Sequence, residues 1–124
     1  MNSSDNSKIR LDSFISIDVE ATGTDINQDK IIEIAACKYK QGKLVETFSS
    51  LINPNKKVSP FISKLTGIKN EDLVNQPVFS QISYDFIEFI KNYPLVGHNI
   101  KFDIDFINKE LGNFNLYENS FICD

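Results

Sequence analysis

The chain has 124 residues, enough for one globular domain with a hydrophobic core and too few for two. Its formal net charge of −4 excludes a broad basic surface that binds nucleic acid by counterion release, so a nucleic acid would have to be held at a small local site. No apolar run approaches the roughly 20 residues that span a bilayer, which excludes a membrane-embedded protein.

The first eight residues, MNSSDNSK, are polar and lack the apolar segment of a signal peptide. We interpret residues 1–8 as a disordered leader and expect a cytoplasmic protein without a membrane partner. Cys37 and Cys123 have no zinc-binding spacing, and the chain has a single histidine. Both cysteines are expected to be small buried hydrophobic residues.

Three runs in the first half of the chain have the composition of strands. Side chains alternate from Ile9 to Val19, with apolar residues on one face and Asp18 and Glu20 on the other. Two further runs, Lys30–Lys40 and Lys43–Ile52, are joined by Gln41-Gly42, where glycine supplies the positive φ of a tight hairpin turn. The three runs predict an antiparallel meander.

The second half of the chain alternates between helical and strand patterns. A short helix is predicted from Pro60 in its first turn to Gly67 as its C-cap, and a longer one across residues 77–93 with its aromatic residues on one buried face. The run LVGHN predicts a short strand, residues 100–111 a helix, and the segment near Phe121 a last strand.

This order of elements predicts an α/β domain with a mixed sheet: three antiparallel strands, then helix, strand, helix and strand. In open α/β sheets, ligands bind beyond the carboxyl ends of the central strands. Asp18 and Glu20 lie at the end of the first strand. On one strand face they are about 6 to 7 Å apart, where hard divalent cations such as Mg²⁺ or Mn²⁺ relieve their repulsion.

A third acid stands in the motif LVGHNIKFDIDF. Asn99 is a candidate N-cap, and Asp103 falls in the first turn of the following helix, where a carboxylate is favoured by the helix dipole. Asp105 lies about 200° further around the helix and is expected to face elsewhere. Each acid also has an ordinary explanation, because Asp-x-Glu arises by chance and acids are common at helix starts. The metal-site prediction therefore depends on the three acids meeting.

These motifs resemble a known family. FISIDVEATGTD, from Phe14 to Asp25, resembles the first exonuclease motif of the DEDD (DnaQ-like) 3′-to-5′ exonucleases, and LVGHNIKFDIDFI resembles the second. The intervening segments, including the LTGI sequence around Thr66, are also similar to that family, so the resemblance extends from Ile9 onward.

The resemblance implies an RNase H-like fold and hydrolysis of phosphodiester bonds from a 3′ end with two Mg²⁺ or Mn²⁺ ions. Asp18 would bridge both metals, Glu20 would bind the metal that holds the attacking water, and Asp103 would bind the second metal. Thr22 and Gly23 would let the backbone approach the terminal nucleotide, and Thr66 would line the same groove.

The family also uses a third motif, a fourth aspartate preceded by a catalytic histidine or tyrosine. The sequence has no match to it, so we expect residues 9–124 to be an incomplete exonuclease domain, truncated at its C-terminus, with little activity alone. His98 belongs to the second motif and is expected to be structural. Tyr84, Tyr93 and Tyr117 do not have the spacing of the third motif. The general base is therefore expected to be missing, and the histidine and tyrosine subfamilies stay open.

Two functions from different classes remain. The first is an exonuclease domain for single-stranded 3′ ends, linked to polymerase proofreading or DNA repair and associated with a polymerase or helicase. The second is a non-catalytic RNase H-like scaffold that binds a protein partner. DNA is the favoured substrate, although RNA offers the metals the same phosphates. A modest basic rim that touches phosphates, or else only a solvated surface, is expected at four lysines: Lys56, Lys57, Lys64 and Lys69.

Overall fold

The computed structural model describes residues 12–112, 114–119 and 122–123; for residues 118, 119, 122 and 123 only the backbone is described. The expected leader at 1–8, residues 9–11 and Phe121 lie outside this range, as does the side chain of Cys123. Within the range, no helix combines the length and apolar character that a membrane crossing requires.

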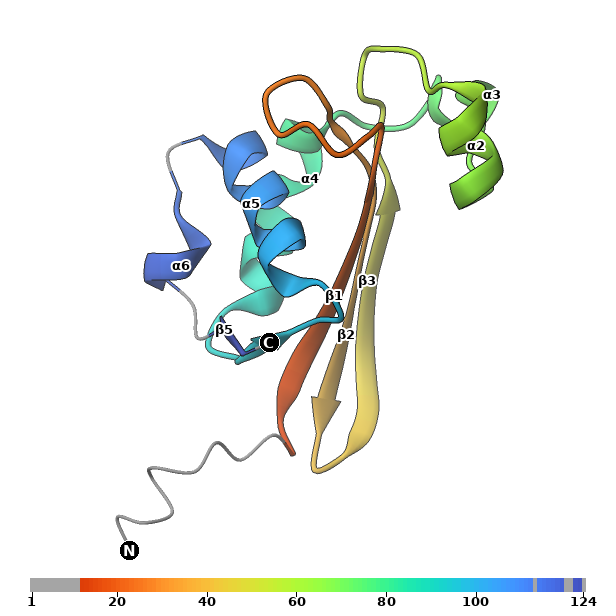
Figure 1. The fold of residues 1–124 in the computed structure, drawn as a ribbon. Coiled ribbons are helices and arrows are strands. Elements are labelled where there is room, and N and C mark those ends of the chain that lie inside the picture. Colours follow the sequence, from red (N-terminus) through yellow and green to blue (C-terminus); the bar gives the residue numbers. More distant parts are fainter. Residues whose placement is uncertain (1–11, 113, 120–121, 124) are drawn as a thin grey trace, which may run out of the picture.

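A mixed five-stranded sheet forms the centre of the molecule, in the order β3-β2-β1-β4-β5 (Figure 1). β1 pairs antiparallel with β2, and β2 antiparallel with β3, which confirms the predicted meander. β4 is parallel to β1 and β5 is parallel to β4. The strands are β1 (Phe14–Ala21), β2 (Ile31–Lys40), β3 (Lys43–Leu51), β4 (Leu95–Val96) and β5 (Ile122–Cys123).

The first strand is shorter at its start than the alternation predicts. It begins at Phe14, opposite Tyr39, while Asp12 and Ser13 lie in a turn. β2 ends one residue beyond Tyr39, and Gln41 and Gly42 then reverse the chain with φ of 52° and 76°. β2 turns away here, and the Asp12 carbonyl oxygen accepts a hydrogen bond from the Gly42 N–H of that turn (2.9 Å) rather than from a strand residue.

Five helices are described: α2 (Pro60–Thr66), α3 (Asn70–Leu73), α4 (Phe79–Ile90), α5 (Ile100–Leu111) and α6 (Leu116–Asn119). α2 has the predicted limits, with Pro60 at its start and Gly67 in the left-handed conformation after it. α4 ends at Ile90, so the predicted helix is too long, and Tyr93 only packs against the core. The sequence interpretation missed α3 and α6, each a single turn of four residues.

The core lies between one face of the sheet and α4 and α5, which pack together over it (Figure 1). Ile15, Ile17 and Val19 of β1 point into this core, as their alternation predicts. A smaller cluster of Ile32, Val58, Ile68 and Leu73 holds α2 and α3 beside the sheet. Cys37 is a free thiol and only half-buried, because Ala36 takes the core-facing position next to it.

Candidate active site

β1 presents two acids on the face of the strand opposite its core residues. Ile17 and Val19 are buried, whereas Asp18 is exposed and Glu20 half-buried. The pairing of β1 with β2 shifts register directly after Glu20, a bulge that ends regular pairing beside the acids. The strand therefore brings both carboxylates to the edge where it ends.

Asp103 reaches the same region because β4 runs parallel to β1 and leads directly into α5. Gly97 makes this close approach possible, since a Cβ there would lie 3.0 Å from the Ile17 carbonyl oxygen and 3.1 Å from Cδ1 of Ile100. Asn99 occupies the predicted N-cap position, although its side chain makes no capping hydrogen bond. Asp103 follows in the first turn, with only 3% of its surface exposed.

The three carboxylates act on one another electrostatically. Burial, together with the nearby charges of Asp18 and Glu20, raises the pKa of Asp103 to about 7. The pKa of Glu20 is also raised, first by burial and then by the charges of Asp18 and Glu33. The negative charges of Asp18 and Glu20 thus disfavour ionisation of Asp103, and the convergence of the three acids around a metal stays a prediction.

This negative charge suits a hard divalent cation, which carboxylate oxygens bind well and which would neutralise the repulsion. Across the described ranges, no three His, Cys, Asp or Glu side chains stand close enough together to hold a metal ion. Repulsion opposes the close approach of three carboxylates unless a cation is present. The carboxylates of Asp18, Glu20 and Asp103 have the right chemistry for Mg²⁺ or Mn²⁺. That they bind one ion together stays a prediction.

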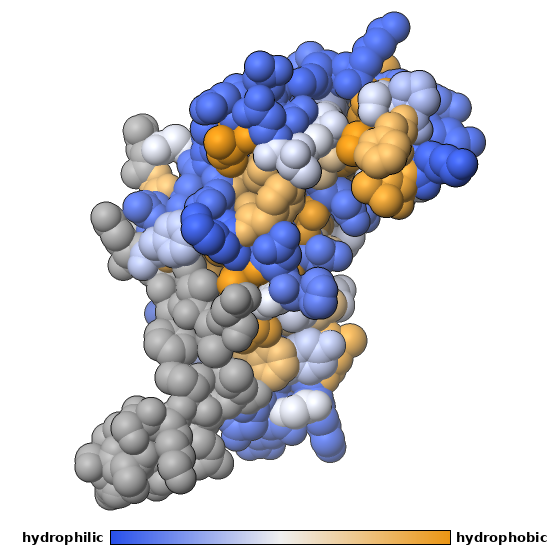
Figure 2. All heavy atoms as spheres, viewed as in Figure 1, coloured by the Kyte–Doolittle hydropathy of each residue, from blue (hydrophilic) through white to orange (hydrophobic). Residues whose placement is uncertain are grey.

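A cleft of about 170 Å³ opens beside Glu20, between the end of β1, α2 and the start of α5. Gly23 and Thr66, both predicted to contact the substrate, line this cleft, together with Thr24 and Phe102. Leu65 of α2 extends the wall outward and is 70% exposed, next to Phe61 at 72%. Figure 2 shows apolar side chains gathered at the end of the molecule that carries α2.

The two threonines use their hydroxyl groups within the protein. The Thr66 hydroxyl donates to the Ile62 carbonyl oxygen (2.8 Å) and accepts from the Ile68 N–H (3.1 Å). The Thr22 hydroxyl donates to Oδ1 of Asp29 (2.8 Å) and accepts from the Lys30 N–H (3.0 Å). Thr22 is buried and does not line the cleft. Gly23 and Thr24, which follow it, do line the cleft.

Asp105 points away from the acids, in agreement with its position on the helix. It pairs with Lys101 (2.9 Å) and accepts a hydrogen bond from the Tyr117 hydroxyl (2.9 Å). Burial and this contact raise the pKa of Tyr117 to about 12. His98 is exposed in the turn before α5. The structural role predicted for His98 stays a prediction.

The lysines of the expected rim differ from one another. Lys57, Lys64 and Lys69 are exposed, and Lys57 and Lys64 border hollows beside α2 and α3. Lys56 is also exposed and lines the same hollow as Lys57, but its Nζ already contacts the Gln28 carbonyl oxygen (2.9 Å) and Asp29 (3.6 Å). At most three of the four lysines are therefore free to meet phosphates.

Sequence reasoning missed two acids beside the site. Glu33 lies opposite Glu20 in the β1–β2 pair. This position depends on the strand register, which the sequence of the connecting loop does not reveal. Asp29 bonds Thr22 across that loop. The available signal for Asp29 was an acid two residues before Ile31, the apolar start of the second strand.

Comparison with known proteins identifies the class of this domain. The RNase T exonuclease model matches residues 15–123, so the chain belongs to this exonuclease family, which confirms the DnaQ-like resemblance of its motifs. The chain is thus an exonuclease-family domain with an RNase H-like fold.

Relatives of the chain include two bacterial proteins of different size. The DNA polymerase III subunit epsilon of Treponema pallidum (strain Nichols) is 42% identical over 98 residues, which cover 79% of this chain and 46% of that protein. The 3′-5′ exonuclease DinG of Bacillus subtilis (strain 168) is 41% identical over 99 residues, 79% of this chain and 11% of that protein. The chain therefore spans about half of the first relative and a small part of the second.

Solved structures agree with this assignment. Exonuclease X in complex with 5′ overhanging duplex DNA matches with a TM-score of 0.61 and 28% identity over 74% of this chain and 52% of that one. Product-bound exonuclease I matches with a TM-score of 0.76 over 90% of this chain and 29% of that one. Its identity of 17% supports the fold alone.

Proposed function

We propose that this chain is a 3′-to-5′ exonuclease domain that hydrolyses phosphodiester bonds at single-stranded DNA 3′ ends with the help of two Mg²⁺ or Mn²⁺ ions. The observation that carries the proposal is the buried Asp103, which lies near Asp18 and Glu20 beside a cleft lined by Gly23 and Thr66, and whose pKa is raised first by burial and then by those two charges. Such a cluster of acids costs stability unless a cation binds there.

In this proposal Asp18 would contact both ions, Glu20 would hold the ion that activates the attacking water, and Asp103 would hold the second. When bound, the ions would acidify the water and stabilise charge on the leaving 3′ oxygen. Gly23, Thr24 and Thr66 would hold the terminal nucleotide in the cleft. The exposed apolar wall at Phe61 and Leu65 is compatible with unstacked bases rather than with a rigid duplex.

The relatives suggest a setting for this activity. One is a subunit of a DNA polymerase and another is DinG, a much longer exonuclease. We propose DNA as the substrate, proofreading or repair as the process, a polymerase or helicase as the partner, and the cytoplasm as the location. The 124 residues contain no match to the third motif, an aspartate preceded by a catalytic histidine or tyrosine. We therefore propose only trace turnover for this chain alone.

A non-catalytic RNase H-like scaffold is the second candidate. It is favoured by one observation, that no three potential metal ligands are close together in the described part of the chain. The two candidates differ in what they require of the acids. A nuclease domain needs Asp18, Glu20 and Asp103 to bind metal, whereas a scaffold for a protein partner does not.

Thermal melting with increasing Mn²⁺ separates the two candidates. If the site binds metal, an ion at 100 times its Kd stabilises the folded chain by about 2.7 kcal/mol. The rise in Tm should disappear in Asp18→Ala and persist in Asp85→Ala, which removes an exposed acid on α4. A parent chain whose Tm does not respond to Mn²⁺ would overturn the nuclease proposal and leave the scaffold.

A further inference from the structure

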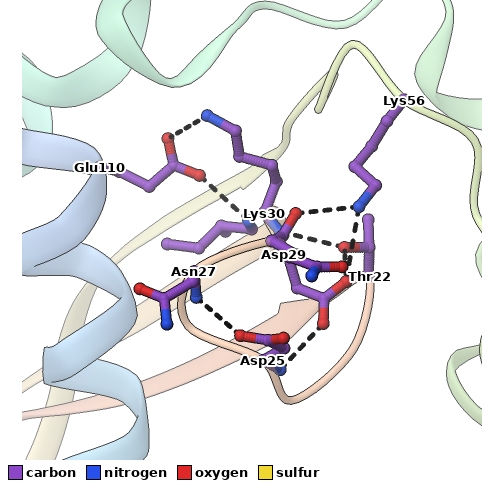
Figure 3. Close-up of polar contacts among 9 residues, drawn as sticks. Thr22, Asp25, Asn27, Asp29, Lys30, Lys56 and Glu110 are labelled. Carbon is purple, nitrogen blue, oxygen red and sulfur yellow. Dashed lines mark hydrogen bonds and ion pairs between the residues drawn. The ribbon is translucent and has the colours of Figure 1, made fainter.

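The loop between β1 and β2 directly follows the acids, and one carboxylate ties its two ends together (Figure 3). Oδ1 of Asp29 accepts a hydrogen bond from the Thr22 hydroxyl (2.8 Å), and Oδ2 accepts one from the Asp25 N–H (2.9 Å). The Asp29 N–H in turn donates to the Asp25 carbonyl oxygen (2.7 Å). Asp29 therefore bonds both the start and the middle of the loop.

The same carboxylate packs directly on Gly23. A Cβ at Gly23 would lie 2.7 Å from Cγ and 2.9 Å from Oδ1 of Asp29, closer than real Cβ contacts allow. A side chain at Gly23 would therefore displace the Asp29 carboxylate from its present position. Gly23 lines the cleft beside Glu20. The position of its backbone in the cleft therefore depends on the Asp29 carboxylate that packs against it.

Lys56 secures the arrangement from a second loop, between β3 and α2. Its Nζ donates to the Gln28 carbonyl oxygen (2.9 Å) and lies 3.6 Å from Oδ1 of Asp29. Burial alone would raise the pKa of Asp29, but hydrogen bonds from Asp25 and Thr22 and the charge of Lys56 lower it overall. The carboxylate therefore stays ionised and keeps accepting these bonds at neutral pH.

We infer that Asp29, supported by Lys56, is a positioning residue that fixes the turn at Gly23 and Thr24 so that its backbone meets the terminal nucleotide in the cleft. Thr22 then serves the substrate indirectly, as the partner of Asp29. This inference rests on the proposed function, because it assigns a role in holding the single-stranded 3′ end. It predicts that loosening the turn weakens nucleotide binding and leaves the metal site intact.

The test measures two quantities on the 124-residue chain: anisotropy of a fluorescein-labelled oligothymidylate with Mn²⁺, and the rise in Tm caused by Mn²⁺ alone. Asp29→Ala and Thr22→Val should each weaken oligothymidylate binding about tenfold, because small displacements of a positioning group are costly. Thr22→Ser keeps the hydroxyl and should recover most of the affinity. Asp85→Ala serves as the matched control.

Each outcome bears on the inference. Loss of oligothymidylate binding with an unchanged Mn²⁺ response supports it. Parental affinity in Asp29→Ala and Thr22→Val overturns it, while the proposed function stands. Loss of the Mn²⁺ response in Asp29→Ala overturns it too, since the role is then general support of the fold. If Asp29→Ala does not fold, the Thr22→Val and Thr22→Ser pair decides. A parent chain that binds no oligothymidylate removes the proposed function and the inference with it.

Discussion

At the scale of single residues, Asp103 links the stability of the metal-free chain to pH. Its folded-state pKa of about 7 lies above the ordinary value of 3.8. Its favourable contribution is therefore fully present below pH 3.8 and is lost as the pH rises through about 7. Asp103→Asn, which carries no charge, should be more stable than the parent at pH 8 by on the order of 1–4 kcal/mol, and similar to it near pH 4.

Urea unfolding in EDTA at several pH values checks this prediction. Acids that do not interact with Asp103, such as Asp29 with its lowered pKa, contribute equally to both chains, so the difference reports Asp103 together with its coupling to Asp18 and Glu20. A constant difference between pH 4 and pH 8 would show that the burial and the neighbouring charges of Asp103 do not strain the folded state.

The same substitution should have the opposite effect once metal is present. A carboxylate is a stronger ligand for Mn²⁺ than a neutral amide, so Asp103→Asn loses affinity for the ion whose charge relieves the acids. We expect the variant to be the more stable chain in EDTA and the parent to overtake it in excess Mn²⁺. Melting curves at pH 8 in both conditions check this. If Asp103→Asn is still more stable than the parent in excess Mn²⁺, Asp103 is not a ligand of the metal.

At the scale of elements, the junction of β4 and α5 places Asp103 beside β1. Gly97→Ala would push a methyl group against the Ile17 carbonyl oxygen at 3.0 Å and Cδ1 of Ile100 at 3.1 Å. Overpacking of this kind costs about 1–3 kcal/mol. We expect that loss in urea unfolding, together with weaker Mn²⁺ binding as α5 moves away from β1.

A second variant identifies which neighbour resists the methyl group. Ile100→Val removes Cδ1, so adding it to Gly97→Ala should restore only part of the stability, since the Ile17 carbonyl belongs to the backbone of β1. Full recovery would assign the clash to Ile100 alone. It would also show that β4 and β1 tolerate a larger residue at this point.

Elements were predictable wherever the signal was local. The alternation in β1, the Gln41-Gly42 turn and the caps of α2 depend on neighbouring residues, and each is found in the structure. The start of β1 was not predictable, because it depends on where β2 turns away. The one-turn helix α3 was also missed: its four residues show no helical period, and only Leu73 is buried.

At the scale of the whole molecule, the sequence predicts a set of acids for one site but not the contacts that surround them. The motifs place Asp18, Glu20 and Asp103 at one edge, since strand alternation and parallel pairing follow from general rules. Contacts across loops follow no such rule. Three features depend on the folded path of residues 22–30: the bond from Thr22 to Asp29, the position of Glu33 opposite Glu20, and the hydrogen bond that Lys56 donates to the Gln28 carbonyl oxygen.

The overall charge predicts how nucleic acid binding responds to salt. With a net charge of −4 and Lys56 held internally, only Lys57, Lys64 and Lys69 of the expected rim are free to neutralise phosphates. Each phosphate contact on a single strand contributes about 0.7 to the slope of log K against log salt, so the slope should not be steeper than about −2. Affinity should depend far more on Mn²⁺ and be abolished by EDTA. Anisotropy titrations of an oligothymidylate at several salt concentrations measure both effects. A slope near −4, or binding that survives EDTA, would mean that the strand is held by a basic surface elsewhere and not by the acids at the end of β1.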